Sequence, residues 1–495
     1  MALVGGKFLS IFDSRRKNRS ETRAANRLGV ILDKEISVLA STLRNPALDI
    51  FDAYYESRQY VSLPPWDSVD PQAPYVPVRQ RQPRHIVNFA KSFAGKVTSK
   101  ILGQSNFPQF NIEEDPDSED MVRAIIKASK IRSRLLEPMR RTLNTGSGFV
   151  RFSLTAGAFK IEHFNSKNVF PKFLPNGELQ EAEIKFVFID KDDKDDKGTP
   201  KKKWFRMVLG ELQDILYDNP EFDEKSEPQF KIVSVADHQL GFVQGEWFRT
   251  SEERDTPDGP SIIQDILGFI DEINYNLSQS SQAVQYNQDP QLIISGMSQD
   301  EISELIRSSQ RGWNMGQEGK GAFLETGMEG VKRASEFRID IKTSIQETAR
   351  MIFLDPEKVV GHAQSAKALE ILHAPLIELI DEIRPCFEQR LQSLVLKLTL
   401  TNLIVNERGG QPAVIIPPGF QPSSLNISVN WPPIFQMTMK DLADKVGVAV
   451  SASNARLISQ ETALKFVAKD FGVEDIEAER IKIEAQPVFN PFGGF

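Results

Sequence analysis

Cysteine, histidine and long apolar runs are all scarce in this chain of 495 residues. The single cysteine, Cys386, excludes an intramolecular disulfide framework and argues against a cysteine-based zinc site. A reducing, intracellular origin fits this usage. No apolar run approaches the ~18 residues of a membrane helix, so we expect no membrane-spanning segment. Near the N-terminus the apolar residues precede the basic ones, which is the reverse of the order in a secretory signal.

Positive charge is not in excess either. The chain has 60 Lys and Arg residues against 68 Asp and Glu residues, a formal net charge of -8. Proteins that grip nucleic acid usually carry a basic footprint, so this balance argues against such a role. It leaves open a protein that handles nucleic acid without holding it. The apolar content of 40% is sufficient for a core, and the length predicts about three domains at ~150 residues each.

The motifs of nucleotide-dependent enzymes are incomplete. Gly95-Lys96 is followed by Val97, and Gly319-Lys320 is followed by Gly321, so neither forms a phosphate-binding loop with its Ser or Thr. The acidic run 190–196 resembles a calcium loop only in composition, because Lys197 and Trp204 stand where oxygen ligands are needed. We interpret that run as a solvated hairpin loop.

Metal-binding and nucleophilic patterns are also missing. The five histidines are never three or four residues apart, so they form no helical metal pair: His85, His163, His238, His362 and His373. Cys386 lies beside Phe387 on an apolar helix face, which favours a structural thiol over a nucleophile. We therefore predict no catalytic residue, no metal site and no cofactor.

The first half of the chain predicts an α+β domain over residues 30–260. Residues 1–29 form a basic arm, either mobile or a docking segment. Six prolines predict an extended stretch over 63–83. Helices are expected over 28–43, 47–60, 86–102 and 121–143, with a break before Pro46, a bend near Pro138 and ends at Gly103 and Gly146. Strands are expected over 149–154, 159–163, 184–189, 204–209, 231–235 and 241–248.

The second half predicts long helices. Apolar residues recur with helical period over 261–288 and 329–354, which indicates an antiparallel pair joined by a small module, 289–328. The distal half of the first helix is rich in Ser, Gln and Asn, which suits packing against identical neighbours or lining a wet channel. A third helical pattern spans 366–402, with kinks expected at Pro375 and Pro385. A strand over 425–429, helical segments over 437–484 and an apolar tail follow.

Several segments resemble the portal proteins of tailed bacteriophages, of the kind found in long-tailed phages. The resemblance covers roughly residues 45–485, and its strength comes from the order and spacing of the segments rather than from any one. They are Gly146-Ser-Gly-Phe-Val-Arg, His238-Gln-Leu-Gly-Phe-Val, Gly259-Pro-Ser-Ile-Ile-Gln-Asp-Ile, Asn276-Leu-Ser, Asp289-Pro-Gln-Leu-Ile-Ile-Ser-Gly, Gly361-His-Ala-Gln-Ser-Ala-Lys-Ala-Leu, Asn430-Trp-Pro-Pro, Leu457-Ile-Ser-Gln-Glu-Thr-Ala-Leu and Asp475-Ile-Glu-Ala-Glu-Arg-Ile. Two positions depart from the family pattern, Gln244 and the pair Ser365-Ala366.

The resemblance implies an elongated, non-enzymatic subunit of a homo-dodecameric ring. Its parts would be an N-terminal arm 1–29, a wing 30–260, stem helices 261–288 and 329–354, a clip 289–328, a tunnel loop 355–366, a long kinked helix returning to the wing 367–435, a crown 436–485 and a tail 486–495. The ring would occupy one capsid vertex of the virion after assembly in the host cytoplasm. Double-stranded DNA would pass through it during packaging and ejection.

The same resemblance implies partners and contact residues. The large terminase ATPase and then the head-tail adaptor would dock on the clip, with major capsid and scaffolding proteins around the ring. Candidate DNA-channel residues are Lys358, Gly361, His362, Gln364 and Lys367. Candidate clip residues are Asp300, Glu301, Arg307, Arg311, Trp313 and Lys320. Two alternatives stay open: a different ring-forming protein of a capsid or secretion assembly, and a soluble enzyme without recognisable motifs.

Overall fold

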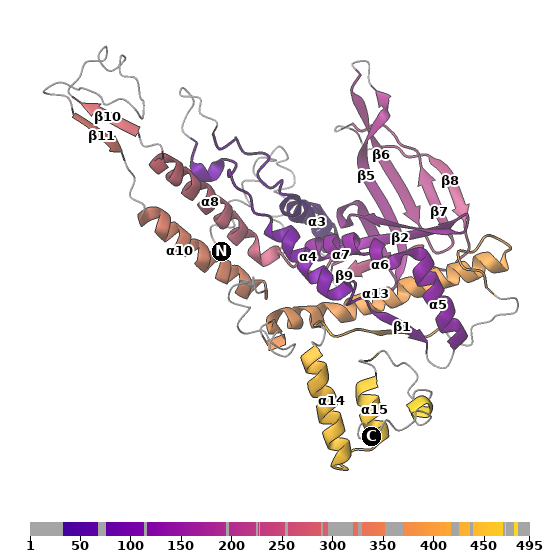
Figure 1. Ribbon diagram of the computed structural model, residues 1–495. Coiled ribbons are helices and arrows are strands. Elements are labelled where there is room, and N and C mark those ends of the chain that lie inside the picture. The colour runs from indigo at the N-terminus through magenta and orange to yellow at the C-terminus, as the bar shows by residue number, and fades with distance from the viewer. Residues whose placement is uncertain are drawn as a thin grey trace. The chain divides into compact units, whose positions relative to one another are not determined.

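The chain divides into two compact units, each with its own internal contacts. One unit comprises Met1–Met351 with Leu379–Pro432, and the other comprises Ile352–Glu378 with Pro433–Phe495. The computed structural model describes residues 33–67, 76–112, 116–194, 198–223, 226, 228–252, 256–288, 291–295, 320–324, 329–351, 370–371, 373–416, 425–435, 439–468, 471 and 480–483. Helices and strands are both abundant (Figure 1), so the α+β class is confirmed.

The helices of the first unit contradict the predicted break before Pro46 and locate the one near Pro138. Helix α3, Asp33–Tyr55, runs through Pro46 instead of breaking there. The fixed φ of proline is compatible with a helix, and the cost is one lost hydrogen bond and a local clash. Pro138 lies in the first turn of α7, Leu136–Thr145, where its missing N–H has no helical partner to lose. The breaks fall at Lys130, whose φ is 53°, and at Leu135, just before α7, so the predicted interruption near Pro138 is present.

These breaks divide the predicted helix 121–143 into three. Helix α5 is Pro116–Ser129, α6 is Ile131–Arg134, and α7 follows. Helix α4, Phe89–Leu102, ends at Gly103 as predicted. A short 3-10 turn, η1, covers Val78–Gln80 within the proline-rich stretch. Helices α4 and α7 pack on one another, and α7 leads directly into the first long strand.

A three-stranded sheet follows α7, in the order β3-β2-β9. Its strands are β2, Ser147–Thr155, β3, Ala158–Phe164, and β9, Gly245–Arg249. Gly146 joins α7 to β2 with a φ of 84°, and a Cβ there would lie 1.9 Å from the Gly259 carbonyl oxygen. Only glycine fits this turn, because the backbone is left-handed and a second chain segment lies against it.

A five-stranded antiparallel sheet has the order β4-β5-β6-β7-β8. Its strands are β4, Val169–Phe173, β5, Leu179–Lys194, β6, Pro200–Leu209, β7, Gln213–Tyr217, and β8, Ile232–Asp237. One face packs against the three-stranded sheet, where Phe149, Trp247, Ile184 and Leu209 are fully buried. The predicted hairpin loop is shorter than expected, because β5 and β6 extend into the acidic run and Lys203 pairs with Asp190 at 3.0 Å.

The helix pair predicted in the second half is present. Helix α8, Leu267–Gln288, follows the 3-10 turn η3, Gln264–Ile266, and α10 is Glu329–Thr348. The two helices lie side by side and run in opposite directions (Figure 1). Strands β10, Gln291–Ser295, and β11, Lys320–Leu324, form an antiparallel hairpin between them, with Ser295 opposite Lys320. The sequence predicted a small module over 289–328, and the pairing of these two strands is non-local within it.

Helix α13, Ala374–Glu407, is the longest helix of the described residues, and it contains Pro385. Pro375 is its second residue, so it lies at the helix start and does not kink an interior, contrary to the prediction. Strand β12, Ile427–Asn430, pairs with β1, Gln109–Ile112, across more than 300 residues of sequence. In the second unit, the expected helical segment 437–484 contains α14, Met439–Asn454, and a separate α15, Gln460–Ala468.

Candidate functional site

Most residues singled out from the sequence lie outside the described residues. This holds for the five channel candidates, Lys358, Gly361, His362, Gln364 and Lys367. It also holds for the clip candidates Asp300, Glu301, Arg307, Arg311 and Trp313. Lys320 is described in its backbone, as the first residue of β11, at the end of the hairpin that connects α8 to α10. The described residues of this region are those of α8 and α10 and the residues that hold these helices in place.

The first half of α8 is anchored through one carboxylate. Tyr54 Oη of α3 donates to Asp271 at 2.9 Å, and Tyr60 Oη donates to the other oxygen at 2.5 Å. Asn274 Nδ2, one turn along α8, donates to the Tyr60 hydroxyl at 3.2 Å. Burial and the neighbouring Asp271 raise the pKa of both tyrosines above the ordinary value of 10. The cluster thus ties α3 and the loop after it to α8.

The proline-rich stretch and the residues just after it form hydrogen bonds to α8 through their backbone groups. Tyr275 Oη donates to the carbonyls of Arg79 and Arg81, at 2.9 Å each. The Val87 amide donates to Asn274 Oδ1 at 2.8 Å, and the His85 amide donates to Ser278 Oγ at 3.1 Å. Burial raises the pKa of Tyr275 to about 12, with Asp271 as the second cause. The predicted extended arm is therefore a brace on α8.

The distal half of α8 is more open. Its side chains are half-buried or exposed from Gln279 to Gln288, and Tyr286 is 48% exposed. Helix α10 buries only Ile341 and Ile345 fully, while Phe337 and Ile339 are 48% and 61% exposed. A helix pair braced at one end and open along its other half has unused packing surface. This agrees with the sequence-based interpretation of polar residues facing neighbours or a wet channel.

A buried charge network fixes α13 to the three-stranded sheet. Glu246 on β9 is 1% exposed and accepts from Lys397 Nζ at 2.7 Å and from Ser393 Oγ at 2.8 Å. Arg390 contacts the other Glu246 oxygen at 3.3 Å and also Glu252 at 2.9 Å. A buried carboxylate is tolerated only when cations and hydrogen bonds compensate its desolvation, as they do here. The network makes α13 and the sheet one mechanical body.

These anchoring residues were not singled out from the sequence. Asp271 and Glu272 lie between Ile270 and Ile273 in the sequence but off the apolar stripe of α8, where acidic residues are ordinary. Neither Asp271 nor its tyrosine partners gave a signal that could have identified the cluster. Glu246 gave no such signal, because acidic residues alternate freely with apolar ones in half-exposed strands.

Among the described residues there is neither a group of metal ligands nor a helix that could span a membrane. Across the described ranges, no three His, Cys, Asp or Glu side chains are grouped as metal ligands would be. Within the same ranges, no helix combines the length and the apolar character needed to span a bilayer. Cys386 is half-buried, and burial raises the pKa of its thiol, so its thiolate is disfavoured.

The chain belongs to the family described as phage portal protein, SPP1 Gp6-like, whose model matches residues 41–487. The resemblance inferred from the sequence is thereby confirmed. The family is a structural one, which supports a non-enzymatic role. A search of curated proteins finds no match.

Solved structures with a similar fold include three chains from gene transfer agent particles. The chain from "Virion of native gene transfer agent (GTA) particle" is 10% identical, with a TM-score of 0.41, and the match covers 77% of this chain and 89% of that one. The chain from "Neck of empty GTA particle computed with C6 symmetry" is 12% identical, with a TM-score of 0.40 and coverages of 77% and 90%. The chain from "Neck of native GTA particle computed with C12 symmetry" is 11% identical, with a TM-score of 0.37 and coverages of 77% and 90%.

Proposed function

We propose that this chain is the subunit of a dodecameric portal ring at one capsid vertex, through which double-stranded DNA passes during packaging and ejection. The observation that carries the proposal is the antiparallel pair α8 and α10, braced at one end and joined by a β-hairpin at the other, in a chain of the portal family. In a ring, twelve such pairs would bury their open faces against each other and enclose a channel.

The parts of the chain then take the following roles. The wing is 30–260, the stem helices are 261–288 and 329–354, the clip is 289–328 and the tunnel loop is 355–366. Residues 367–435 return to the wing, and 436–485 form the crown. The buried network around Glu246 supports this division, because it fixes α13, the helix that follows the tunnel loop, to the wing.

An acidic chain suits a conduit for DNA. Each phosphate neutralised by a fixed cation adds affinity, and tight binding would stall movement in either direction. We propose that a few weak contacts suffice and that the tunnel loop supplies them, through Lys358, Gly361, His362, Gln364 and Lys367. A net charge of -8 limits attraction elsewhere along the path.

The clip would hold the partners that change during assembly. We propose that the large terminase ATPase docks there first and the head-tail adaptor later, using Asp300, Glu301, Arg307, Arg311, Trp313 and Lys320. The lack of a nucleotide-binding loop in this sequence fits a separate motor. Major capsid and scaffolding proteins would surround the ring in the host cytoplasm, and the ring would stay in the virion.

Shortening the clip tests this assignment. Residues 296–319 are replaced by Asn-Gly, which closes an antiparallel hairpin at the pair Ser295 and Lys320. We expect the ring to form, because the strands and helices remain, and we expect terminase-driven packaging to be lost. The measurement is nuclease-protected DNA in a reconstituted packaging reaction. As the matched control, the tip 195–199 of the β5–β6 hairpin is shortened in the same way. Unchanged packaging by the shortened clip would show that the docking site lies elsewhere.

A further inference from the structure

Strand β8 is an edge strand whose side chains are all exposed. In the described sheet it pairs only with β7. All six of its residues are exposed, and three are large and apolar: Ile232 at 60%, Val233 at 63% and Val235 at 50%. Edge strands are normally protected by Lys, Pro or a bulge that turns the edge away. The interior of β8 reads Val-Ser-Val-Ala, with no charge and no proline, and its one irregularity is the register shift at Val233 near the start of the strand.

The sheet face that continues from β8 carries exposed apolar residues among charged ones. The register places Val235 opposite Ile215 and Ile232 opposite Tyr217, on the face turned away from the core. Val187 and Ile189 of β5 lie on this same outer face and are 37% and 59% exposed. The outer face of an antiparallel sheet is ordinarily polar, because it meets water. Here charged residues such as Lys185 and Arg206 alternate with the apolar ones, and the exposed apolar side chains are the part that a partner would cover.

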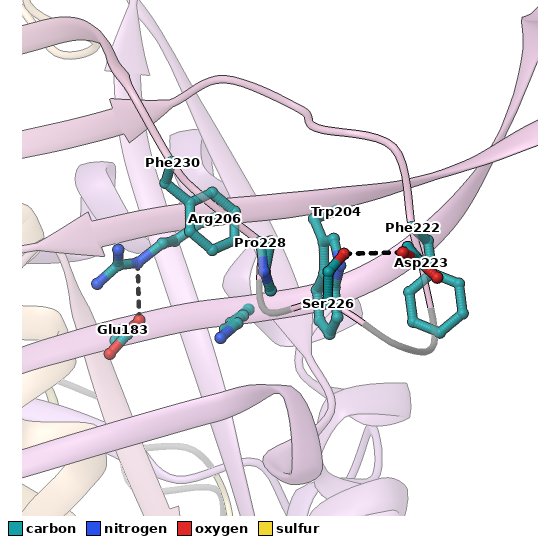
Figure 2. A pocket seen from close by; sticks show the side chains of 9 residues that line it. Glu183, Trp204, Arg206, Phe222, Asp223, Ser226, Pro228 and Phe230 are labelled. Atoms are coloured by element: carbon teal, nitrogen blue, oxygen red, sulfur yellow. Dashed lines mark hydrogen bonds and ion pairs between the residues drawn. The ribbon is translucent and has the colours of Figure 1, made fainter.

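A hollow of about 550 Å³ lies on the same face, and part of its wall comes from the residues that precede β8 (Figure 2). Its walls include Trp204, Phe222 and Phe230. Arg206 is neutralised by Glu183, at 2.8 Å. The Lys185 ammonium lies 5.2 Å from the Trp204 ring centroid and 5.4 Å from that of Phe230. Glu183 and Asp223 also line the hollow, but Glu183 pairs with Arg206 and Asp223 accepts from Ser226 Oγ at 2.9 Å. Among the described residues no ion pair joins either carboxylate to Lys185, so its ammonium can take an acidic side chain of a partner.

We propose that β8 accepts an extended segment of a different protein of the particle shell, which adds to the sheet as a sixth strand. This inference rests on the proposed ring. A segment antiparallel to β8 would end beside Phe230, so the residues after it would enter the hollow and place an acidic side chain near Lys185. The recognised chemistry is thus an apolar alternating strand followed by an acidic residue.

A second copy of this chain fits β8 less well than another protein does. Pairing of β8 with β8 has twofold symmetry, which a cyclic ring of heterologous contacts does not contain. The opposite edge of the sheet, β4, carries Pro171 at its centre and Lys172 beside it, and both oppose strand addition. The outer edge of the other sheet, β3, carries Lys160 and Glu162. The ring therefore leaves β8 to a partner of different sequence.

Blocking the edge without breaking the sheet tests the proposal. The His238 amide donates to the Leu212 carbonyl, and hydrogen-bonded pairs alternate along an antiparallel ladder, so the Val235 amide points away from β7. Val235→Pro removes that outward donor, and Val235→Lys adds an edge charge. Each chain is co-expressed with the major capsid and scaffolding proteins of its particle. We expect the share of particles that contain a ring to fall at least about tenfold.

Val61→Lys is the matched control, since Val61 is an apolar residue 69% exposed elsewhere on the first unit; it should leave incorporation unchanged. A photo-crosslinking residue in place of Val233, which the register leaves unpaired, identifies the contact. The expected product joins this chain to an extended segment of a shell protein. Normal incorporation of both Val235 variants, or crosslinks only between copies of this chain, would overturn the inference. A wild-type chain that forms no ring would instead contradict the proposed function, on which the inference rests.

Discussion

At the scale of single residues, the buried polar groups lie where separate elements meet. The Asp271 carboxylate accepts hydrogen bonds from the hydroxyl groups of Tyr54 and Tyr60, which are more than 200 residues away in the sequence. A tyrosine hydroxyl that donates to a buried carboxylate is held in its neutral form, because its ionisation would place two negative charges side by side. The cluster therefore works as a lock between α3 and α8, and it depends on the protonation of the tyrosines.

Stability should accordingly fall at alkaline pH. The folded state raises the pKa of Tyr54 and Tyr60, so their stabilisation is complete below the unfolded value of ~10 and is lost as the pH rises above it. We expect the urea midpoint to drop between about pH 10 and 11. Tyr54→Phe combined with Tyr60→Phe should flatten that drop, whereas an unchanged slope in the double variant would show that other groups cause it.

Removing the shared carboxylate should destabilise the chain far more than removing its neighbour. Asp271→Ala leaves two buried hydroxyl groups without an acceptor, which costs about 2–4 kcal/mol. Glu272→Ala removes only a pair with Arg79, whose side chain is 58% exposed, and costs about 0–1 kcal/mol. Urea unfolding followed by near-ultraviolet circular dichroism compares the two. Equal losses would mean that the Asp271 cluster is not a structural lock.

At the scale of elements, the sequence predicted most helices and strands but misplaced their ends. Period and punctuation located α8, α10 and the strands around Gly146, because these signals are local. Two prolines misled, since Pro46 lies inside α3 and Pro375 in the first turn of α13, whereas the interruption near Pro138 is present at Leu135. Strand β11 was missed because its Gly-rich sequence forms a strand only when β10 lies beside it. The pairing of β1 with β12 is equally non-local.

The attachment of α13 to the sheet should depend on Glu246. Glu246→Ala leaves Arg390 and Lys397 buried without their shared anion, so we expect a loss of about 3–5 kcal/mol in the free energy of unfolding. Adding Lys397→Met should recover part of that loss, since it removes one uncompensated cation. Glu181→Ala, which breaks only the exposed pair with Lys172, serves as the control. Additive losses in the double variant would contradict a coupled network.

At the scale of the whole molecule, the single cysteine, the acidic balance and the incomplete enzymatic motifs favour a structural role. The order of short motifs identified the family, whose model matches residues 41–487. The candidate site was less accessible to sequence reasoning. Contacts such as Tyr60 with Asp271, or Glu246 with Lys397, join positions that no local pattern connects.

The single chain leaves several large apolar side chains exposed to solvent. Ile339 on α10 and Val448 on α14 are 61% and 63% exposed, as expected of a subunit that completes its burial in an assembly. Light scattering of the purified chain at several salt concentrations measures its mass in solution and so tests whether it forms the ring. Twelve chains of 55.8 kDa predict a particle of about 670 kDa with cyclic symmetry, and thirteen would also agree. A monomer at every protein and salt concentration would contradict the proposed ring.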